Sequence, residues 1–198
     1  MPSHVKATQD TNQVLGSHRS RTAVEWPQNT FQGLIVTPPH FCNHIVSGGQ
    51  TGADRAALDF AIEHGYPHGG WAPRGREAED GVIPAKYQLT VLVEGGYRQR
   101  TRRNVEDSDG TLIINLGELE GGSLATQAFA QRMCKPHLVV QADTGITQYA
   151  AANVLLWVRE SNIKILNVAG PRESKRPGIY LRTLELLRAI DRLHAEGG

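Results

Sequence analysis

The sequence has few of the residues on which several common functions depend. Its two cysteines, Cys42 and Cys134, form no CxxC pair, so the spacing predicts neither a disulfide framework nor a zinc site and fits a reducing cytoplasm. Aromatic residues make up only 6% of the 198 residues, which leaves little to build a surface that stacks nucleic-acid bases. No segment approaches the roughly 18 consecutive apolar residues of a membrane helix. The formal net charge is +1, so no polybasic coat is present. We expect no nucleic-acid and no membrane partner.

Glycine, by contrast, is abundant, with 21 residues. A chain of this length with 39% hydrophobic residues suits one domain of ordinary size plus a modest tail. High glycine with few aromatic residues favours binding sites built from backbone groups.

Residues 1–43 show almost no apolar periodicity and are predicted to form a flexible N-terminal extension. An organellar transit peptide is an alternative, suggested by the arginines and serines of residues 17–21, although acidic residues count against it. Three aromatic residues could instead anchor the segment on its own domain or on a partner subunit: Trp26, Phe31 and Phe41.

From residue 44 onward, short apolar runs alternate with helical patterns. Ile45 and Val46 lead into a glycine turn and then a helix that Gly65 ends. Apolar runs at 111–115, 138–140 and 163–168 are each followed by a glycine-containing turn and a helix. Helical crossovers between short apolar strands indicate a parallel sheet. We therefore predict an α/β fold for residues 44–198, a single doubly wound, mostly parallel sheet with helices on both faces.

The segment 66–96 is less regular. Gly70, Trp71 and Ala72 suggest a further strand, and residues 89–93 a short apolar segment. Between them lies a long loop, APRGREAEDGVIP, and long loops in compact domains are often functional.

The first glycine loop directly follows a strand and opens a helix. Glycines there would let backbone N–H groups approach an anion at the positive helix end, with two hydroxyls as further donors. The alternative is a tight turn that needs glycine for packing. The loop is neither GxGxxG nor a Walker sequence. The candidate binding residues are Ser47, Gly48, Gly49, Gln50, Thr51 and Gly52.

Two later junctions repeat this arrangement, and the carboxyl ends of parallel strands meet at one edge of a sheet. In the last, the guanidinium of Arg172 offers a fork of donors to a phosphate, with a surface ion pair as the alternative. The candidate binding residues are Gly121, Gly122, Ser123 and Thr126 at one junction, and Gly170, Pro171, Arg172 and Ser174 at the other.

Two charged segments add further candidates. The basic run 98–103 is typical of a solvated helix face, but it could turn Thr101 and Asn104 toward an anionic ligand. In the long loop, Glu79 or Asp80 could accept hydrogen bonds from the amino and ring N–H edge of a pterin or guanine. The alternative for that loop is a mobile charged segment.

Residues for covalent or metal chemistry do not stand out. His64 and His68 are separated by Gly65 and Pro67, which break the helix that would place both on one face. No GxSxG elbow is present. The apolar stripe from Leu181 to Ile190 is typical of a core-facing helix, although it also offers a surface for self-association. We predict no catalytic and no metal-ligating residues.

Four motifs occur in register: SGGQTGADRAALD, TRRNVEDSDGTLII, GGSLAT and NVAGPRES. With them, residues 44–193 resemble the molybdenum-cofactor carrier family, the circularly permuted YpsA branch of the Rossmann-like SLOG superfamily. The resemblance implies a Rossmann-like fold, homo-oligomers, and a phosphorylated pterin or nucleotide-like ligand held by the glycine loops. It implies the molybdenum cofactor, molybdopterin, as the bound molecule, which the carrier protects until an apo-molybdoenzyme takes it.

Two other functions stay open, and the first of them comes from the same superfamily. Lonely-Guy-type enzymes hydrolyse the N-glycosidic bond of nucleoside 5′-monophosphates with a Gly-Gly-x-Gly-Thr loop and a following Glu. Here Ala125 replaces the last Gly and Phe129 stands where the Glu would be, so a carboxylate from 77–80 would have to substitute. A nucleotide-sensing module is the third hypothesis.

Overall fold

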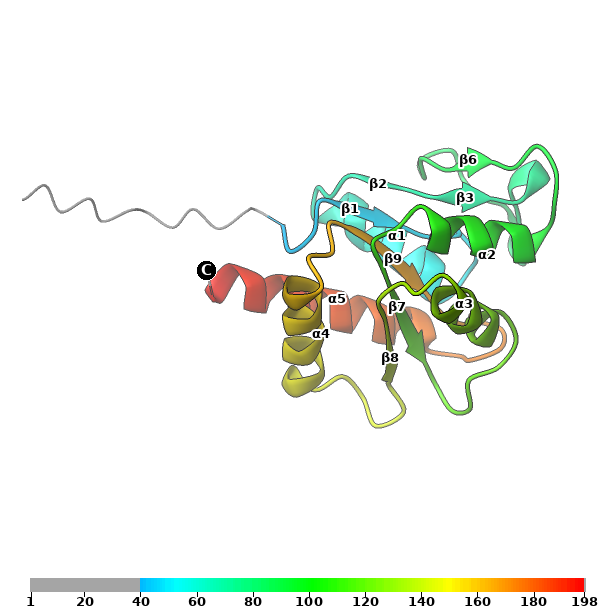
Figure 1. Ribbon diagram of the computed structural model, residues 1–198. Coiled ribbons are helices and arrows are strands. Elements are labelled where there is room, and N and C mark those ends of the chain that lie inside the picture. Colours follow the sequence, from blue (N-terminus) through cyan, green and yellow to red (C-terminus); the bar gives the residue numbers. More distant parts are fainter. Residues whose placement is uncertain (1–39, 198) are drawn as a thin grey trace, which may run out of the picture. The chain divides into compact units, whose positions relative to one another are not determined.

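A computed structural model describes residues 40–197 (Figure 1). The predicted extension falls almost wholly outside these residues, and so do Trp26 and Phe31. Phe41 lies inside them and is buried, with its ring centroid 5.2 Å from that of Tyr66 and 6.4 Å from that of Phe60. The packed core therefore includes residues before the predicted boundary at residue 44.

The central sheet has five parallel strands in the order β2-β1-β9-β7-β8. Ile113 and Ile114 in its middle are fully buried. Such continuous apolar strands are expected where helices cover both faces of a sheet. The strands are β1 (His44–Val46), β2 (His68–Gly69), β7 (Gly110–Asn115), β8 (His137–Gln141) and β9 (Ile165–Ala169).

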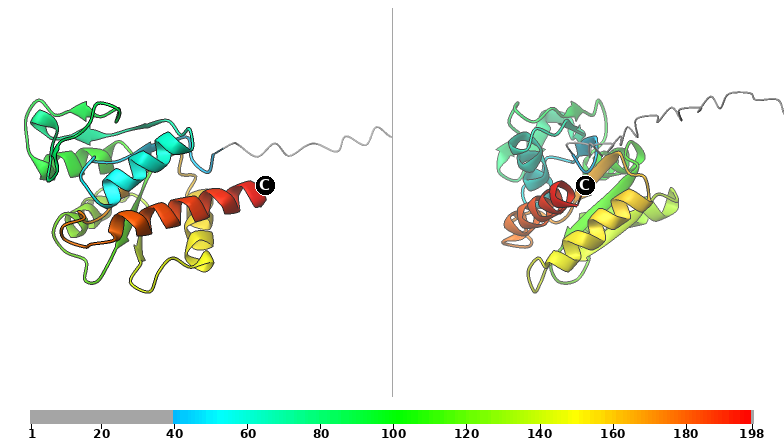
Figure 2. Two further views of the ribbon diagram at one scale, coloured as in Figure 1. Left: turned by 180° about the vertical axis from the view of Figure 1, so that it is seen from behind. Right: turned by 90° about the vertical axis from the view of Figure 1, so that its left-hand side faces the viewer.

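Helices cover both faces, which confirms the doubly wound prediction (Figures 1 and 2). On one face α5 packs between α1 and α4, and on the other α2 packs against α3. Most of the apolar stripe of α5 points inward: Leu184, Leu187 and Ile190 are buried and form core, whereas Leu181 is 62% exposed. The helices are α1 (Ala53–Glu63), α2 (Tyr97–Glu106), α3 (Gly121–Arg132), α4 (Gln148–Glu160) and α5 (Ile179–Glu196). Across residues 40–197, no helix is both long and apolar enough to span a membrane.

The winding direction reverses at the middle of the sheet. From β1 the chain crosses through α1 to β2 on one side, whereas from β7 it crosses through α3 to β8 on the other. β9 lies between β1 and β7. In open parallel sheets the crevice at such a reversal, outside the carboxyl ends of the strands, is where ligands bind.

The irregular segment 66–96 begins with β2, which joins the central sheet, and its remainder forms two small sheets. The strand predicted near residues 70–72 is present as β3 (Trp71–Ala72), and it pairs with β6 (Thr90–Val91) in the short apolar segment 89–93. Between them lie a short 3-10 turn, Arg74–Arg76, and a hairpin of β4 (Glu77–Ala78) and β5 (Gly81–Val82). The guanidinium of Arg76 donates to the carbonyls of Ile83, Pro84, Tyr87 and Leu89. Arg76 thus links the charged loop to the residues that follow it.

Candidate functional site

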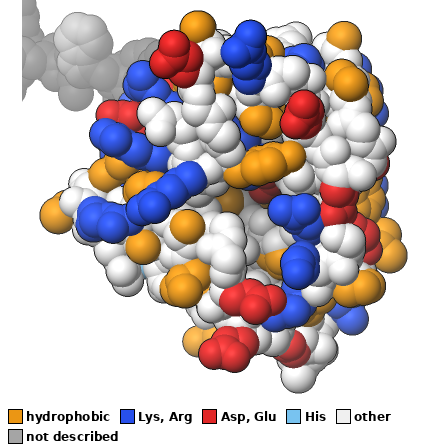
Figure 3. Space-filling model, turned by 90° about the vertical axis from the view of Figure 1, so that its right-hand side faces the viewer, with side chains coloured by type: hydrophobic (Ala, Val, Ile, Leu, Met, Phe, Trp, Pro, Cys, Tyr) orange, Lys and Arg blue, Asp and Glu red, His pale blue; other side chains and the backbone are white. Residues whose placement is uncertain are grey.

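A cavity of about 540 Å³ opens at the carboxyl ends of the central strands, where α2 and α3 begin. Figure 3 shows this face, with Lys and Arg side chains on both sides of a hollow. Its floor continues into a hollow of about 40 Å³ lined by buried polar residues, among them Asn104, Thr126 and Asn167. The volume lies within the range of small-molecule sites in proteins.

Eleven of the predicted residues line this cavity or its floor, and seven do not. The lining residues are Gly48, Gln50, Thr101, Asn104, Gly121, Gly122, Ser123, Thr126, Gly170, Pro171 and Arg172. Those outside the lining are Ser47, Gly49, Thr51, Gly52, Glu79, Asp80 and Ser174.

The glycine loop at the start of α3 is open. A Cβ atom at Gly121 or Gly122 would meet no atom within 4 Å, so neighbouring atoms do not require glycine at either position, and only the φ of +54° at Gly121 favours it. The first intrahelical bond runs from Leu124 N–H to Glu120 O, and Glu120 makes no side-chain cap. The amides of Gly121, Gly122 and Ser123 therefore lack intrahelical partners, at the positive end of the helix dipole. These three residues all line the cavity.

The glycine loop at the start of α1 is instead closed by the chain that follows β9. The amide of Ala53 donates to the carbonyl of Pro171 at 3.3 Å, and a Cβ at Gly52 would lie 2.5 Å from that same oxygen. Ser47 is buried and donates its hydroxyl to Val168 O at 2.7 Å. Gly52 and Ser47 thus serve the packing of the turn.

Gln50 is the member of that first loop that lines the cavity of about 540 Å³. Its Oε1 accepts from the backbone amides of Thr51 at 3.0 Å and Glu79 at 2.9 Å, which fixes the orientation of the amide group. The remaining atom, Nε2, is buried without a hydrogen-bond partner, although the residue lines the cavity. A buried donor left unsatisfied is costly. An acceptor atom of a bound molecule would satisfy it.

Arg100 and Asp54 form a buried pair that sequence reasoning missed. The Nη2 atom of Arg100 lies 3.5 Å from Oδ2 of Asp54, and the Nε of Arg100 is buried without a partner. A Cβ at Gly48 would lie 2.7 Å from both side chains, so glycine there makes room for the pair. Burial raises the pKa of the Asp54 carboxyl above its usual value, although Arg100 opposes this shift.

Helical spacing is the signal that could have found this pair. Arg100 lies three residues after Tyr97 and four before Asn104, on the face of α2 that lines the cavity. Asp54 stands in the first turn of a helix that a glycine loop opens.

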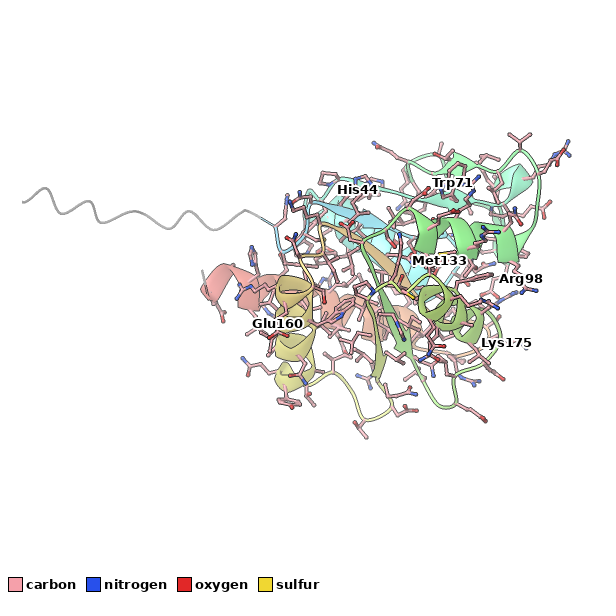
Figure 4. All side chains as sticks on the ribbon, in the orientation of Figure 1. His44, Trp71, Arg98, Met133, Glu160 and Lys175 are labelled. Atoms are coloured by element: carbon pink, nitrogen blue, oxygen red, sulfur yellow. The ribbon has the colours of Figure 1, made fainter. Side chains whose placement is uncertain are left out.

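The charges around the cavity favour an anion. Its basic residues are Arg98, Arg100, Arg172 and Lys175, against two carboxylates, Asp54 and Glu120. Figure 4 shows Arg98 and Lys175 at the same end of the molecule, beside the start of α3. Glu120 also pairs with Arg176 at 2.9 Å. Because basic side chains outnumber carboxylates in the lining, the cavity suits a ligand rich in acceptor oxygens.

Glu79 joins the β4–β5 hairpin to the two glycine loops nearest to it. Its carboxylate accepts from the hydroxyls of Thr51 and Ser174 and from the Ser174 amide at 3.2 Å, and Arg172 lies 3.8 Å away. Burial would raise the pKa of Glu79, but the hydrogen bonds from Ser174 and Thr51 outweigh it and hold the pKa below its usual value. Asp80 pairs with Arg55 at 2.9 Å. Neither carboxylate lines the cavity, so they hold the loops rather than face its interior.

Replacing Glu79 by Gln should lower stability at pH 7 by about 1 to 3 kcal/mol, since charge-assisted hydrogen bonds would be lost. The folded-state pKa is lowered, so the carboxylate's contribution is complete above the ordinary Glu pKa. It disappears as the pH falls through the lowered value. Urea unfolding at pH 7 and at acid pH should therefore show the variant converging on the wild type in acid. Glu77→Gln, at an exposed position of the same hairpin, is the control. Equal stabilities of Glu79→Gln and wild type at pH 7 would contradict this role.

A second hollow, of about 640 Å³, lies between α5 and the start of α4. Its arginines include Arg182, paired with Glu185 at 2.9 Å, and Arg188, which donates to Glu63 at 2.6 Å. Within residues 40–197, none of the buried side-chain atoms without a partner belongs to its lining. It therefore lacks the unsatisfied donors that mark the first cavity.

Comparison with known proteins places the chain in a family with a solved structure. The model of the circularly permutated YpsA SLOG family matches residues 45–190. A crystal structure from Syntrophus aciditrophicus SB, named "Putative molybdenum carrier protein", superposes with a TM-score of 0.74 at 49% sequence identity. The match covers 76% of this chain and 96% of that one. No curated protein matched the sequence. The family match spans the sheet, the glycine loops and all the cavity-lining residues, and the chain belongs to the circularly permuted YpsA SLOG family.

Proposed function

We propose that this protein binds a phosphorylated ligand in the cavity, with the phosphate on the first-turn amides of α3. The observation that carries the proposal is the open start of this helix: Gly121 and Gly122 border empty space, line a donor-rich cavity and have amides without intrahelical partners. Arg98 and Lys175 would neutralise the phosphate. Gln50 and Arg100, each with a buried unpartnered nitrogen, would donate to other acceptor atoms of the same molecule.

We further propose that the ligand is molybdopterin carrying molybdenum, bound as cargo. The residues present fit such a molecule, since molybdopterin ends in a phosphate monoester and its pterin carries acceptor nitrogens and a carbonyl. The relative at 49% identity bears the name of a molybdenum carrier, which supports this choice. In this role the protein shields its cargo from water and oxidants. Assembly into homo-oligomers, delivery to a molybdoenzyme and a cytoplasmic location stay predictions.

The carrier role can be tested with two linked measurements. Native mass spectrometry of protein purified anaerobically should detect a retained small molecule with the mass of molybdopterin. Added molybdenum cofactor should co-elute with the protein and lose activity in air more slowly than free cofactor. Cofactor that neither co-elutes nor survives longer would contradict the carrier role.

The structure argues against the carboxylates expected for N-glycosidic hydrolysis, but it places another carboxylate at the cavity. Phe129 is buried between α2 and α3, and Glu77, Glu79 and Asp80 lie outside the cavity lining, so none supplies the expected carboxylate. Asp54 is the buried carboxylate that borders the cavity. The hydrolase hypothesis therefore depends on the two carboxylates that line the cavity, the buried Asp54 and the more exposed Glu120. A panel of nucleoside 5′-monophosphates should release no free base, and release abolished by Asp54→Asn would instead favour hydrolysis.

A further inference from the structure

Tyr97 is the one aromatic side chain that lines the cavity within the described part of the chain. It is the first residue of α2 and is 43% exposed. Isolated apolar side chains on a surface are common and need no explanation. This one differs because it borders a donor-rich cavity and has a fixed neighbour.

The cavity face of α2 runs from the rim to the floor. Tyr97, Arg100 and Asn104 lie at helical positions i, i+3 and i+7, which share one face. Exposure falls along this face from 43% at Tyr97 to 4% at Asn104. A ligand lying along α2 would therefore have one end on the polar floor and another part beside the Tyr97 ring.

Arg100 contacts the Tyr97 ring. Its guanidinium carbon lies 5.5 Å from the ring centroid, within the range of a cation–π contact. Arg100 is itself held by Asp54, and its side chain is only 12% exposed. A ring positioned in this way can offer its remaining surface to a flat partner at a small cost in conformational entropy.

We infer that Tyr97 is a stacking residue and that the ligand carries a planar nitrogen heterocycle joined to its phosphate. The inference rests on the proposed function, because it takes the phosphate to be bound at the start of α3. The cavity of about 540 Å³ has room for both parts. Stacking requires a flat ring, so pterins and purines would both bind beside Tyr97. The phosphate would contribute the part of the affinity that ligands of both kinds have in common. Specificity for a flat ring thus comes from Tyr97 and anion binding from α3.

The test compares two probes by calorimetry: ribose 5-phosphate, which has no base, and guanosine 5′-monophosphate, whose guanine shares the aminopyrimidinone edge of a pterin. On the wild-type protein the base should tighten binding about tenfold or more. Tyr97→Phe keeps the aromatic face and should preserve that ratio. Tyr97→Leu should reduce it to about threefold or less, while the dissociation constant of ribose 5-phosphate stays within about twofold. Unchanged ribose 5-phosphate binding also shows that the variant is folded.

The outcomes separate the two proposals. If ribose 5-phosphate binds but the base adds nothing, the stacking inference is overturned and the phosphate site stands. If the ratio survives in Tyr97→Leu, the heterocycle lies elsewhere and the inference is likewise overturned. If neither probe binds the wild-type protein, the proposed function fails as well.

Discussion

Replacing Gly122 by Asp is expected to weaken binding of ribose 5-phosphate by about 100-fold or more while the protein remains folded. A Cβ at Gly122 meets nothing within 4 Å, so the new side chain has room. An acidic residue in the first turn of a helix interacts favourably with the helix dipole, which should leave the melting temperature equal or higher. The same carboxylate would stand where the proposed ligand places its phosphate, and the two like charges would repel. Calorimetric titration with a thermal melt measures both effects.

Gly122→Asn is the matched control, because it has nearly the same shape as Asp without the charge. It should bind ribose 5-phosphate at least about tenfold more tightly than Gly122→Asp, since only the charge differs. Equal affinities for the two variants would show that the charge is irrelevant. Wild-type affinity in Gly122→Asp would place the phosphate somewhere other than the start of α3.

Replacing Gly52 by Ala is expected to destabilise the protein by about 2 to 5 kcal/mol, the sum of an overpacking and a backbone term. Its φ of +76° and ψ of −131° form a conformation that glycine adopts readily but that costs a side-chain-bearing residue free energy. Its Cβ would also lie 2.5 Å from the carbonyl oxygen of Pro171 and 2.7 Å from the amide nitrogen of Glu173. Both are backbone atoms and cannot swing aside. Urea denaturation should show the midpoint shifted strongly downward.

Gly65→Ala is the control for a positive φ without crowding. Gly65 has a similar φ of +72°, but a Cβ there would meet nothing within 4 Å. This variant should therefore lose only the backbone term of about 1 to 2 kcal/mol. A loss in Gly52→Ala no greater than in Gly65→Ala would mean that the contact between the loop and Pro171 does not hold the site together.

The fold was largely predictable because its signals are local. The switch from the apolar run at Ile45 to a glycine turn and then to helical spacing predicts strand, turn and helix from neighbouring residues. Once the strands are parallel, the glycine loops must meet at one edge of the sheet. The boundary at residue 44 was less predictable, because the burial of Phe41 depends on Phe60 and Tyr66, which are distant in the sequence.

Which glycine loop is closed by packing and which is open to the cavity could not be predicted from the sequence. SGGQTG and GGSLAT look equivalent as helix-opening turns, and only the position of Pro171 closes the first and leaves the second open. Glu79 was a candidate for ligand contact because its carboxylate suits a pterin edge. The hairpin instead turns it toward Thr51 and Ser174. Such assignments depend on contacts between residues far apart in the chain.

The most direct test of the account is the site at which a phosphate compound perturbs the backbone amides. In ¹H–¹⁵N spectra of the full chain titrated with ribose 5-phosphate, the account predicts the largest shifts at Gly121, Gly122 and Ser123, and small ones at Gly52 and Ala53. Largest shifts at Gly52 and Ala53, with the start of α3 unaffected, would contradict it.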